Sequence, residues 1–136
     1  MIKLYHYSNK DFKGYIKPSF FGLNNYSRNS ERLSGVERSY YYINQAGREY
    51  YFNRANYCYI AEIKEGLLYN LDKDPLKLAG RVKDIYSAVK SRDYKGIISG
   101  NIAVLFYWAK IKQRKTLTEA GRYVILKLKR GQDDKF

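Results

Sequence analysis

Residues 57–63, YCYIAEI, are the stretch of this chain that most clearly predicts a β-strand. Large and β-branched side chains dominate it, and its alternation runs as far as the turn signal KEG at 64–66. Such a pattern is typical of a pleated strand with one face buried. Cys58, the only cysteine in the chain, lies inside this run, so we expect a small buried hydrophobic residue rather than a nucleophile.

Further strands are predicted on both sides of this run. Residues 2–7 and 39–43 are rich in strand-forming residues, and 67–71 is expected to be extended. Two more strands are expected within 93–99 and 101–111, joined at Ser99–Gly100–Asn101, where Gly100–Asn101 suits a tight turn. A last strand is predicted at 122–128.

Two segments are predicted to be helical. Residues 81–92 carry apolar side chains at the spacing of one helix face, namely Val82, Ile85, Tyr86 and Val89. Residues 44–55 are predicted to form a second short helix. Asp72 or Asp74, beside Pro75, is placed to form a turn and to cap the helix at 81–92. Because strands dominate, we predict an α+β domain with a mostly antiparallel sheet and two or three short helices.

The length and composition fit one folded domain. The chain has 136 residues, of which 45% are hydrophobic, enough for a core. We assign residues 1–130 to this domain and 131–136 to a polar, frayed C-terminal end. Residues 8–38 are dense in Ser, Asn and Gly, and long irregular segments of this kind are usually functional or disordered; their aromatic residues favour order.

The charge predicts the kind of partner. Lys and Arg number 26 against 13 Asp and Glu, so the net charge is +13 and should attract phosphates, nucleic acid or an acidic protein. With one histidine and one cysteine, no metal-ligand spacing occurs, and we predict no metal site. No apolar run could span a membrane and no signal-peptide pattern is present. We therefore expect a soluble cytoplasmic protein without a membrane partner, monomeric rather than an obligate oligomer.

Five stretches occur along the chain in a specific order. They are LYHYS at 4–8, FFGLNNYS at 20–27, RSYYYI at 38–43, LLYNLDKDPLKL at 67–78 and DYKGIISGNIAVLF at 93–106. In this order they resemble ADP-ribosyltransferase-like domains, particularly the short versions in phage-associated polyvalent proteins and related toxins. The resemblance implies a split antiparallel sheet, a nicotinamide cleft, NAD as the substrate and a His–Tyr–Glu triad.

The histidine of that triad closes the first strand in an H-x-[ST] pattern, which in this chain is His6-Tyr7-Ser8. The resemblance implies that His6 hydrogen-bonds the nicotinamide-side ribose and that Ser8 supports this residue or the amide. An imidazole held at a strand end can offer one donor and one acceptor to ribose hydroxyls. The alternative is a histidine that merely packs between Tyr5 and Tyr7.

The second triad member is an aromatic residue that stacks on nicotinamide. Tyr41 faces opposite to Tyr40 and Tyr42 if 39–43 is a strand. We assign the role to Tyr41, with Tyr42 as second choice, because an aromatic face attracts a cationic ring. At least one of these tyrosines is expected to pack in the core.

Other cofactor contacts are implied for Tyr7, Gly22, Asn24 and Arg38. The phosphates and adenosine of the cofactor could be reached by Arg38 and by Asn24 with its neighbours Asn25 and Ser27. A guanidinium forms a fork that suits phosphate, although Arg38 could equally be an ordinary solvated arginine.

The third triad member is where this chain departs from the pattern. Asn101 stands at the position of the usual glutamate and lacks the negative charge that stabilises a developing cation. Glu62 or Glu119 could supply the acid instead. Otherwise the domain works without it, as relatives that modify nucleic acid or phosphate groups do, or it has kept binding alone.

Two functions are consistent with these features. The resemblance implies NAD-dependent transfer of ADP-ribose to a host protein or nucleic acid, as a phage-encoded modifier of host or defence machinery acting in the host cytoplasm. The alternative is a non-enzymatic basic protein whose tyrosines and basic residues contact nucleic acid or an acidic protein surface.

Overall fold

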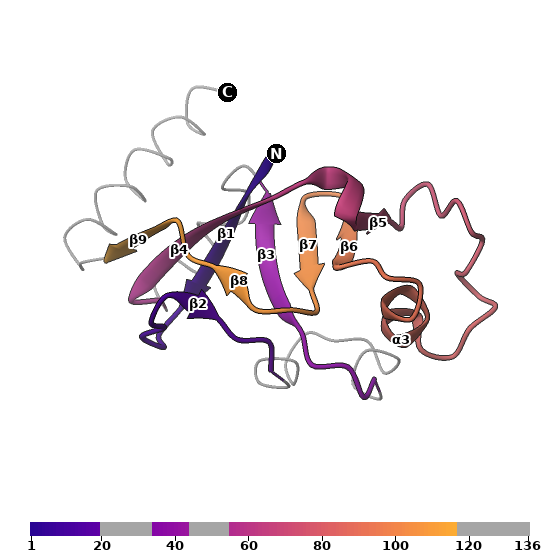
Figure 1. Cartoon of the computed structure of the whole chain (residues 1–136), viewed down its shortest axis with the longest axis horizontal. Coiled ribbons are helices and arrows are strands. Elements are labelled where there is room, and N and C mark those ends of the chain that lie inside the picture. Colours follow the sequence, from indigo (N-terminus) through magenta and orange to yellow (C-terminus); the bar gives the residue numbers. More distant parts are fainter. Residues whose placement is uncertain (20–33, 44–54, 117–136) are drawn as a thin grey trace, which may run out of the picture.

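The computed structural model describes residues 1–19, 34–43 and 55–116 (Figure 1). In chain order its elements are β1 (Ile2–Ser8), β2 (Tyr15–Ile16), β3 (Ser39–Ile43), β4 (Tyr57–Ile63), the 3-10 helix η1 (Glu65–Leu67), β5 (Leu68–Asn70), α3 (Ile85–Lys90), β6 (Gly96–Ser99), β7 (Ile102–Leu105), β8 (Ala109–Lys110) and β9 (Gln113–Thr116). Strands therefore dominate the described part, and α3 is the one α-helix in it.

Within the described ranges, seven strands form one mixed sheet in the order β5-β6-β7-β3-β1-β4-β9. Only β5 and β6 pair in parallel, and every other neighbouring pair is antiparallel. β1 lies between β3 and β4, so the first strand of the chain is enclosed on both edges. β2 and β8 pair separately as a short antiparallel ribbon on the viewer's side of the sheet in Figure 1.

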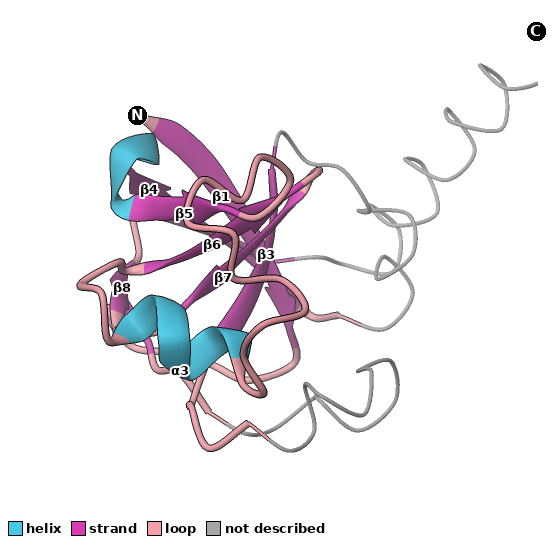
Figure 2. Ribbon diagram, turned by 90° about the vertical axis from the view of Figure 1, so that its right-hand side faces the viewer, coloured by secondary structure: helices cyan, strands magenta, loops and turns pink. Residues whose placement is uncertain are grey.

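Alternation along the strands separates two faces of this sheet. The ribbon packs on one face through Ile16 and Ala109, and we call this the ribbon face. The sheet residues buried on the ribbon face include Leu4, Tyr41, Tyr59 and Leu105. Helix α3 packs on the other face, which we call the helix face (Figure 2). The residues buried there include Tyr69, Tyr86, Val89, Ile97 and Val104.

Several predicted elements are confirmed with small changes. The strands predicted at 39–43 and 57–63 have the bounds of β3 and β4, and β1 runs one residue beyond the predicted 2–7. The turn at Gly100–Asn101 joins β6 to β7, with Gly100 at a φ of 57°. All but the last residue of the helix predicted at 44–55, and the whole strand predicted at 122–128, lie outside the described residues.

The helix predicted at 81–92 is shorter, because Asp84 ends it on its N-terminal side. The Asp84 side chain accepts hydrogen bonds from the backbone N–H groups of Tyr86 and Ser87, which makes it the N-cap of α3. The expectation that Asp72 or Asp74 caps this helix is therefore wrong. Both are turn residues instead: Asp74 accepts hydrogen bonds from the N–H groups of Leu78 and Ala79, and Asp72 binds the β6–β7 turn.

Candidate functional site

His6 lies on β1 between aromatic residues of both neighbouring strands. It pairs with Tyr59 of β4, and the β1–β3 register, in which Tyr5 is opposite Tyr42, places it opposite Tyr41. Its ring centroid is 5.3 Å from that of Tyr41 and 6.4 Å from that of Tyr59. His6 and Tyr41 therefore lie side by side on the ribbon face, in the middle of the sheet.

The tautomer of His6 follows from its hydrogen bond. Nδ1 lies 2.7 Å from the carbonyl oxygen of Tyr40, which can only accept, so Nδ1 carries the proton and donates. No residue in the described ranges bonds to Nε2. Burial lowers the pKa of His6, while the bond to the Tyr40 carbonyl acts in the opposite direction. His6 is thus a partly buried neutral imidazole whose Nε2 can accept a hydrogen bond from a ligand.

Tyr41 supports His6 from within the core. Only 1% of its surface is exposed, and its hydroxyl accepts a hydrogen bond of 3.1 Å from the Ser39 hydroxyl. Burial raises the pKa of Tyr41 well above its usual value, with a smaller contribution from Tyr107. The stacking role predicted for Tyr41 needs a ring face open to a ligand, and this ring has none exposed.

Phe12 occupies the outer side of His6. Its ring meets His6 edge-on at 5.8 Å and Tyr59 at 5.4 Å between centroids. The Tyr59 hydroxyl fixes this segment, because it donates to the Lys10 carbonyl at 2.6 Å and accepts from the Phe12 N–H at 2.9 Å. Phe12 is only partly buried, so it is the ring beside His6 that retains exposed surface.

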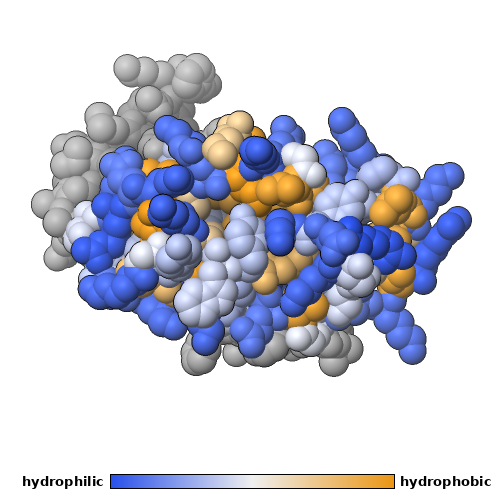
Figure 3. All heavy atoms as spheres, viewed as in Figure 1, coloured by the Kyte–Doolittle hydropathy of each residue, from blue (hydrophilic) through white to orange (hydrophobic). Residues whose placement is uncertain are grey.

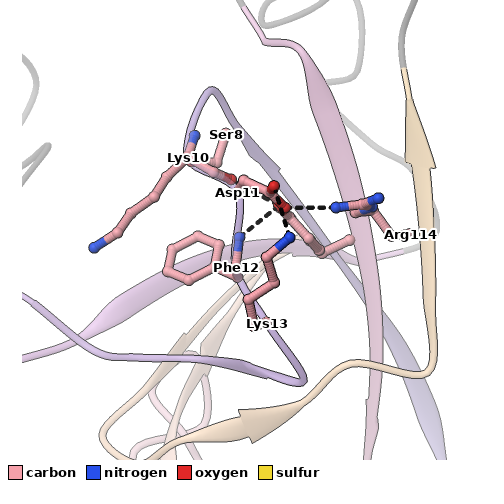
Figure 4. A network of polar contacts seen from close by, with 7 residues as sticks. Ser8, Lys10, Asp11, Phe12, Lys13 and Arg114 are labelled. Carbon is pink, nitrogen blue, oxygen red and sulfur yellow. Dashed lines mark hydrogen bonds and ion pairs between the residues drawn. The ribbon is translucent and has the colours of Figure 1, made fainter.

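Asp11 ties the same segment to the edge of the sheet. Its carboxylate accepts from Lys13 at 2.9 Å and pairs with Arg114 of β9 (Figure 4). The Arg114 guanidinium also lies 5.2 Å from the centre of the Tyr57 ring. The hydrogen bond and charge of Lys13, followed by Arg114, hold the pKa of Asp11 below its usual value. Asp11 is therefore an ionised carboxylate close to Phe12.

Tyr7 and Tyr42, both predicted cofactor contacts, lie on the helix face. Their rings are 6.2 Å apart and pack against the cluster of Tyr5, Cys58 and Ile60. Since strand residues alternate, neither shares a face with His6. Cys58 is buried, and burial raises the pKa of its thiol, as suits the structural role predicted for it.

Arg38, the predicted phosphate contact, is a buried structural residue. It is 1% exposed, its guanidinium stacks 4.3 Å from the centre of the Tyr86 ring, and it donates to the Val36 carbonyl at 2.9 Å. It also donates to the Tyr40 hydroxyl at 2.9 Å. These contacts join the start of β3 to α3 and leave the guanidinium on the side of the sheet opposite His6.

Asn101 and Glu62 are not brought to His6. Asn101 lies level with Ile43, whose N–H donates to its carbonyl oxygen at 2.8 Å. It is therefore roughly 7 Å along the strands and roughly 10 Å across them from His6. Glu62 is exposed opposite Lys3 and points to the other face. The Ser8 hydroxyl accepts from the Lys10 N–H at 3.0 Å, and Gly22, Asn24 and Glu119 lie outside the described residues.

The sequence did not indicate Asp11, Phe12, Tyr59 or Arg114 as part of this site. They come from three separated segments that only the β1–β4–β9 register brings together, and no local spacing signals that pairing. The one local hint was the density of aromatic residues within the irregular segment 8–38.

Comparison of the chain with protein-family models, with curated proteins and with solved structures finds no match. The described residues contain no group of His, Cys, Asp and Glu side chains that could hold a metal ion. In the same ranges no helix has the length and apolar character needed to cross a membrane.

Proposed function

We propose that this chain is an ADP-ribosyltransferase-like domain that binds NAD on the ribbon face and transfers ADP-ribose to a macromolecule. The single observation that supports this best is the pairing of His6 with Tyr41. The two side chains that the resemblance assigns to ribose and nicotinamide recognition are neighbours, with ring centroids 5.3 Å apart. The imidazole is fixed in the tautomer that leaves Nε2 as an acceptor.

In this proposal His6 accepts a hydrogen bond from a ribose hydroxyl, and Tyr41 holds the imidazole in place. Phe12 replaces Tyr41 as the ring that meets the nicotinamide, because it retains exposed surface beside His6. An aromatic face near a cationic ring is electrostatically favourable. Binding then requires a small shift of Phe12, whose backbone N–H is held by the Tyr59 hydroxyl and whose ring packs against His6, Tyr59 and the Lys10 ammonium.

The reaction is dissociative. The bond between the ribose anomeric carbon and the nicotinamide nitrogen breaks, and its electron pair leaves with nicotinamide, which becomes neutral. A nucleophile of the acceptor then bonds to the ribose carbon and loses its proton. Asp11 is the carboxylate nearest to His6 in sequence and lies in the segment that packs on it, so it joins Glu119 as a candidate for the missing negative charge.

Two measurements test this function. Because His6 is the only histidine, its imidazole NMR signals are unambiguous, and they should shift on titration with NAD. Label from NAD carrying a tag on its adenine should also transfer to a component of cell lysate. The His6→Ala variant, which has no imidazole signal to follow, should lose the label transfer. Tyr5→Phe, on the same strand but the opposite face, is the matched control and should keep both the NMR shift and the label transfer. Unchanged imidazole signals at millimolar NAD would exclude the proposal.

A further inference from the structure

The β2–β8 ribbon carries four exposed side chains on its outer face. Ile16 and Ala109 pair across the ribbon and point into the core, where they are 0% and 3% exposed. Because strand residues alternate, their neighbours Tyr15, Lys17, Trp108 and Lys110 point outward. Tyr15 lies opposite Lys110, and the same register sets Lys17 opposite Trp108.

This arrangement places aromatic rings on one diagonal and lysines on the other. Trp108 is 57% exposed and Tyr15 is 47% exposed, both unusual for large aromatic residues. The Lys17 ammonium lies 5.7 Å from the centre of the Trp108 ring. Diagonal neighbours on a two-stranded ribbon are roughly 7–8 Å apart, so one extended ligand can contact both rings.

The segments around the ribbon are strongly cationic. Residues 9–17 and 107–116 contain seven basic residues, Lys10, Lys13, Lys17, Lys110, Lys112, Arg114 and Lys115, against one acid, Asp11. Asp11 is already paired with Lys13 and Arg114. Hydrophilic side chains cover much of this side of the molecule, interrupted by smaller hydrophobic areas (Figure 3). The local potential is therefore positive where the two rings are exposed.

We propose that the outer face of the β2–β8 ribbon binds single-stranded nucleic acid. A single strand offers unpaired bases and a chain of phosphates. Bases stack on exposed aromatic faces, and the neighbouring ammonium groups neutralise the phosphates. A duplex hides its base faces and would use only the lysines. An acidic protein would use the lysines but offers no flat rings in regular succession. None of the four outward side chains is among the residues that contact His6 in the described ranges. The proposal does not depend on binding or cleavage of NAD.

The single tryptophan of the chain supplies a direct readout. Titration of the intact protein with unlabelled oligothymidine of about 20 nucleotides should quench the Trp108 fluorescence as bases stack on the indole. Anisotropy of the same oligonucleotide carrying a fluorophore gives the dissociation constant. Oligouridine of equal length should behave in the same way, and a duplex of equal length should bind more weakly and quench less.

Variants separate stacking from charge. Trp108→Ala should weaken binding at least about fivefold, whereas Trp108→Phe, which keeps a ring, should retain most of it. The double variant Lys17→Ala/Lys110→Ala should lower the slope of log affinity against log salt by about 1.4. Lys73→Ala/Lys83→Ala removes two other lysines, both distant from the ribbon in sequence, and is the matched control. His6→Ala should bind as the wild type does.

Three results would overturn the proposal. The first is no quenching and no anisotropy change at low salt. The second is binding that survives both Trp108→Ala and the ribbon double variant, which places the site elsewhere. The third is equal Trp108-dependent binding of an acidic polypeptide such as polyglutamate, which would assign the surface to a protein partner. The ribbon variants alter exposed residues, and circular dichroism verifies the fold of every variant.

Discussion

His6 combines a fixed tautomer with partial burial, and this fixes its response to pH. Burial lowers its pKa below the ordinary value of 6.5, so the unfolded chain takes up a proton more readily than the folded one. As far as His6 is concerned, the free energy of unfolding is therefore highest above about pH 6.5. It declines as the pH falls from there toward the folded-state pKa of His6. The hydrogen bond from Nδ1 to Tyr40 is retained in either protonation state.

The first prediction concerns this titration. NMR should give a folded-state pKa for His6 below 6.5. Urea unfolding should show that the wild type loses stability between about pH 7 and pH 5.5, by no more than about 1.4 kcal/mol per pH unit. His6→Gln, which cannot titrate, should flatten that part of the profile. A measured pKa at or above 6.5 contradicts the prediction.

The second prediction concerns the Tyr59 hydroxyl. Tyr59→Phe removes an acceptor for the Phe12 N–H and a donor to the Lys10 carbonyl, and both groups are partly buried. We expect a loss of about 1–3 kcal/mol in unfolding free energy, together with faster amide exchange at Phe12. Tyr57→Phe is the control, since no described residue bonds to the Tyr57 hydroxyl, and it should change stability by less than about 0.5 kcal/mol. Equal effects of the two substitutions would refute this role.

At the scale of elements, local pattern predicted β3 and β4, merged β7 and β8 into one strand at 101–111, and missed β2 and β9. β3 and β4 had the predicted bounds because tyrosine, isoleucine and alternation all favour strand there. β2 and β8 have two residues each, too few to display a period, and their pairing depends on a contact between segments far apart in the chain. Asp84 was missed as a cap because the apolar spacing beginning at Val82 suggested an earlier helix start.

The same limit applied to the candidate site. The neighbouring positions of His6 and Tyr41 could be expected from the resemblance, but the face of each tyrosine on 40–42 depends on register, which pattern alone does not fix. Arg38 illustrates a second limit. Its type suits phosphate, yet the stacking on Tyr86 and the bond to the Val36 carbonyl place it in the core, and only tertiary contacts reveal that.

The third prediction concerns the middle of the β5–β6–β7 group. A Cβ added to Gly96 would fall far inside contact distance of the Val104 carbonyl oxygen and would also touch Leu68 and Leu105 at 3.0 Å. Gly96→Ala should therefore destabilise the fold by about 1–3 kcal/mol or more in urea unfolding. Gly66→Ala is the control, because nothing lies within 4 Å of its added Cβ. A Gly96→Ala protein as stable as the wild type would show that β5 and β7 can separate at little cost.

Over the whole molecule, the excess of basic residues is only weakly compensated. The net charge is +13, and both ion pairs found among the described residues involve Asp11. Like charges spread over a small body repel one another and disfavour the compact state. The charge that would attract a polyanion therefore also reduces the stability of the free protein.

The fourth prediction concerns salt. Raising NaCl from about 20 mM to about 300 mM should increase the melting temperature, because screening weakens the repulsion. The increase should shrink near the sequence pI of about 9.7, where the net charge approaches zero. Differential scanning calorimetry at neutral pH and at about pH 9.5 provides the comparison. A melting temperature that falls with salt at neutral pH would mean that attractive pairs outweigh the repulsion.

The enclosed position of β1 has a consequence for biosynthesis. β1 lies between β3 and β4 in the sheet, and β4 ends only at Ile63. β1 therefore leaves the ribosome well before either of its two partner strands exists. The β6–β7 hairpin, by contrast, can close as soon as it is synthesised, since only Gly100 and Asn101 separate its strands. Until β4 is available, the apolar side chains of β1 stay exposed on the nascent polypeptide, where a chaperone could bind them.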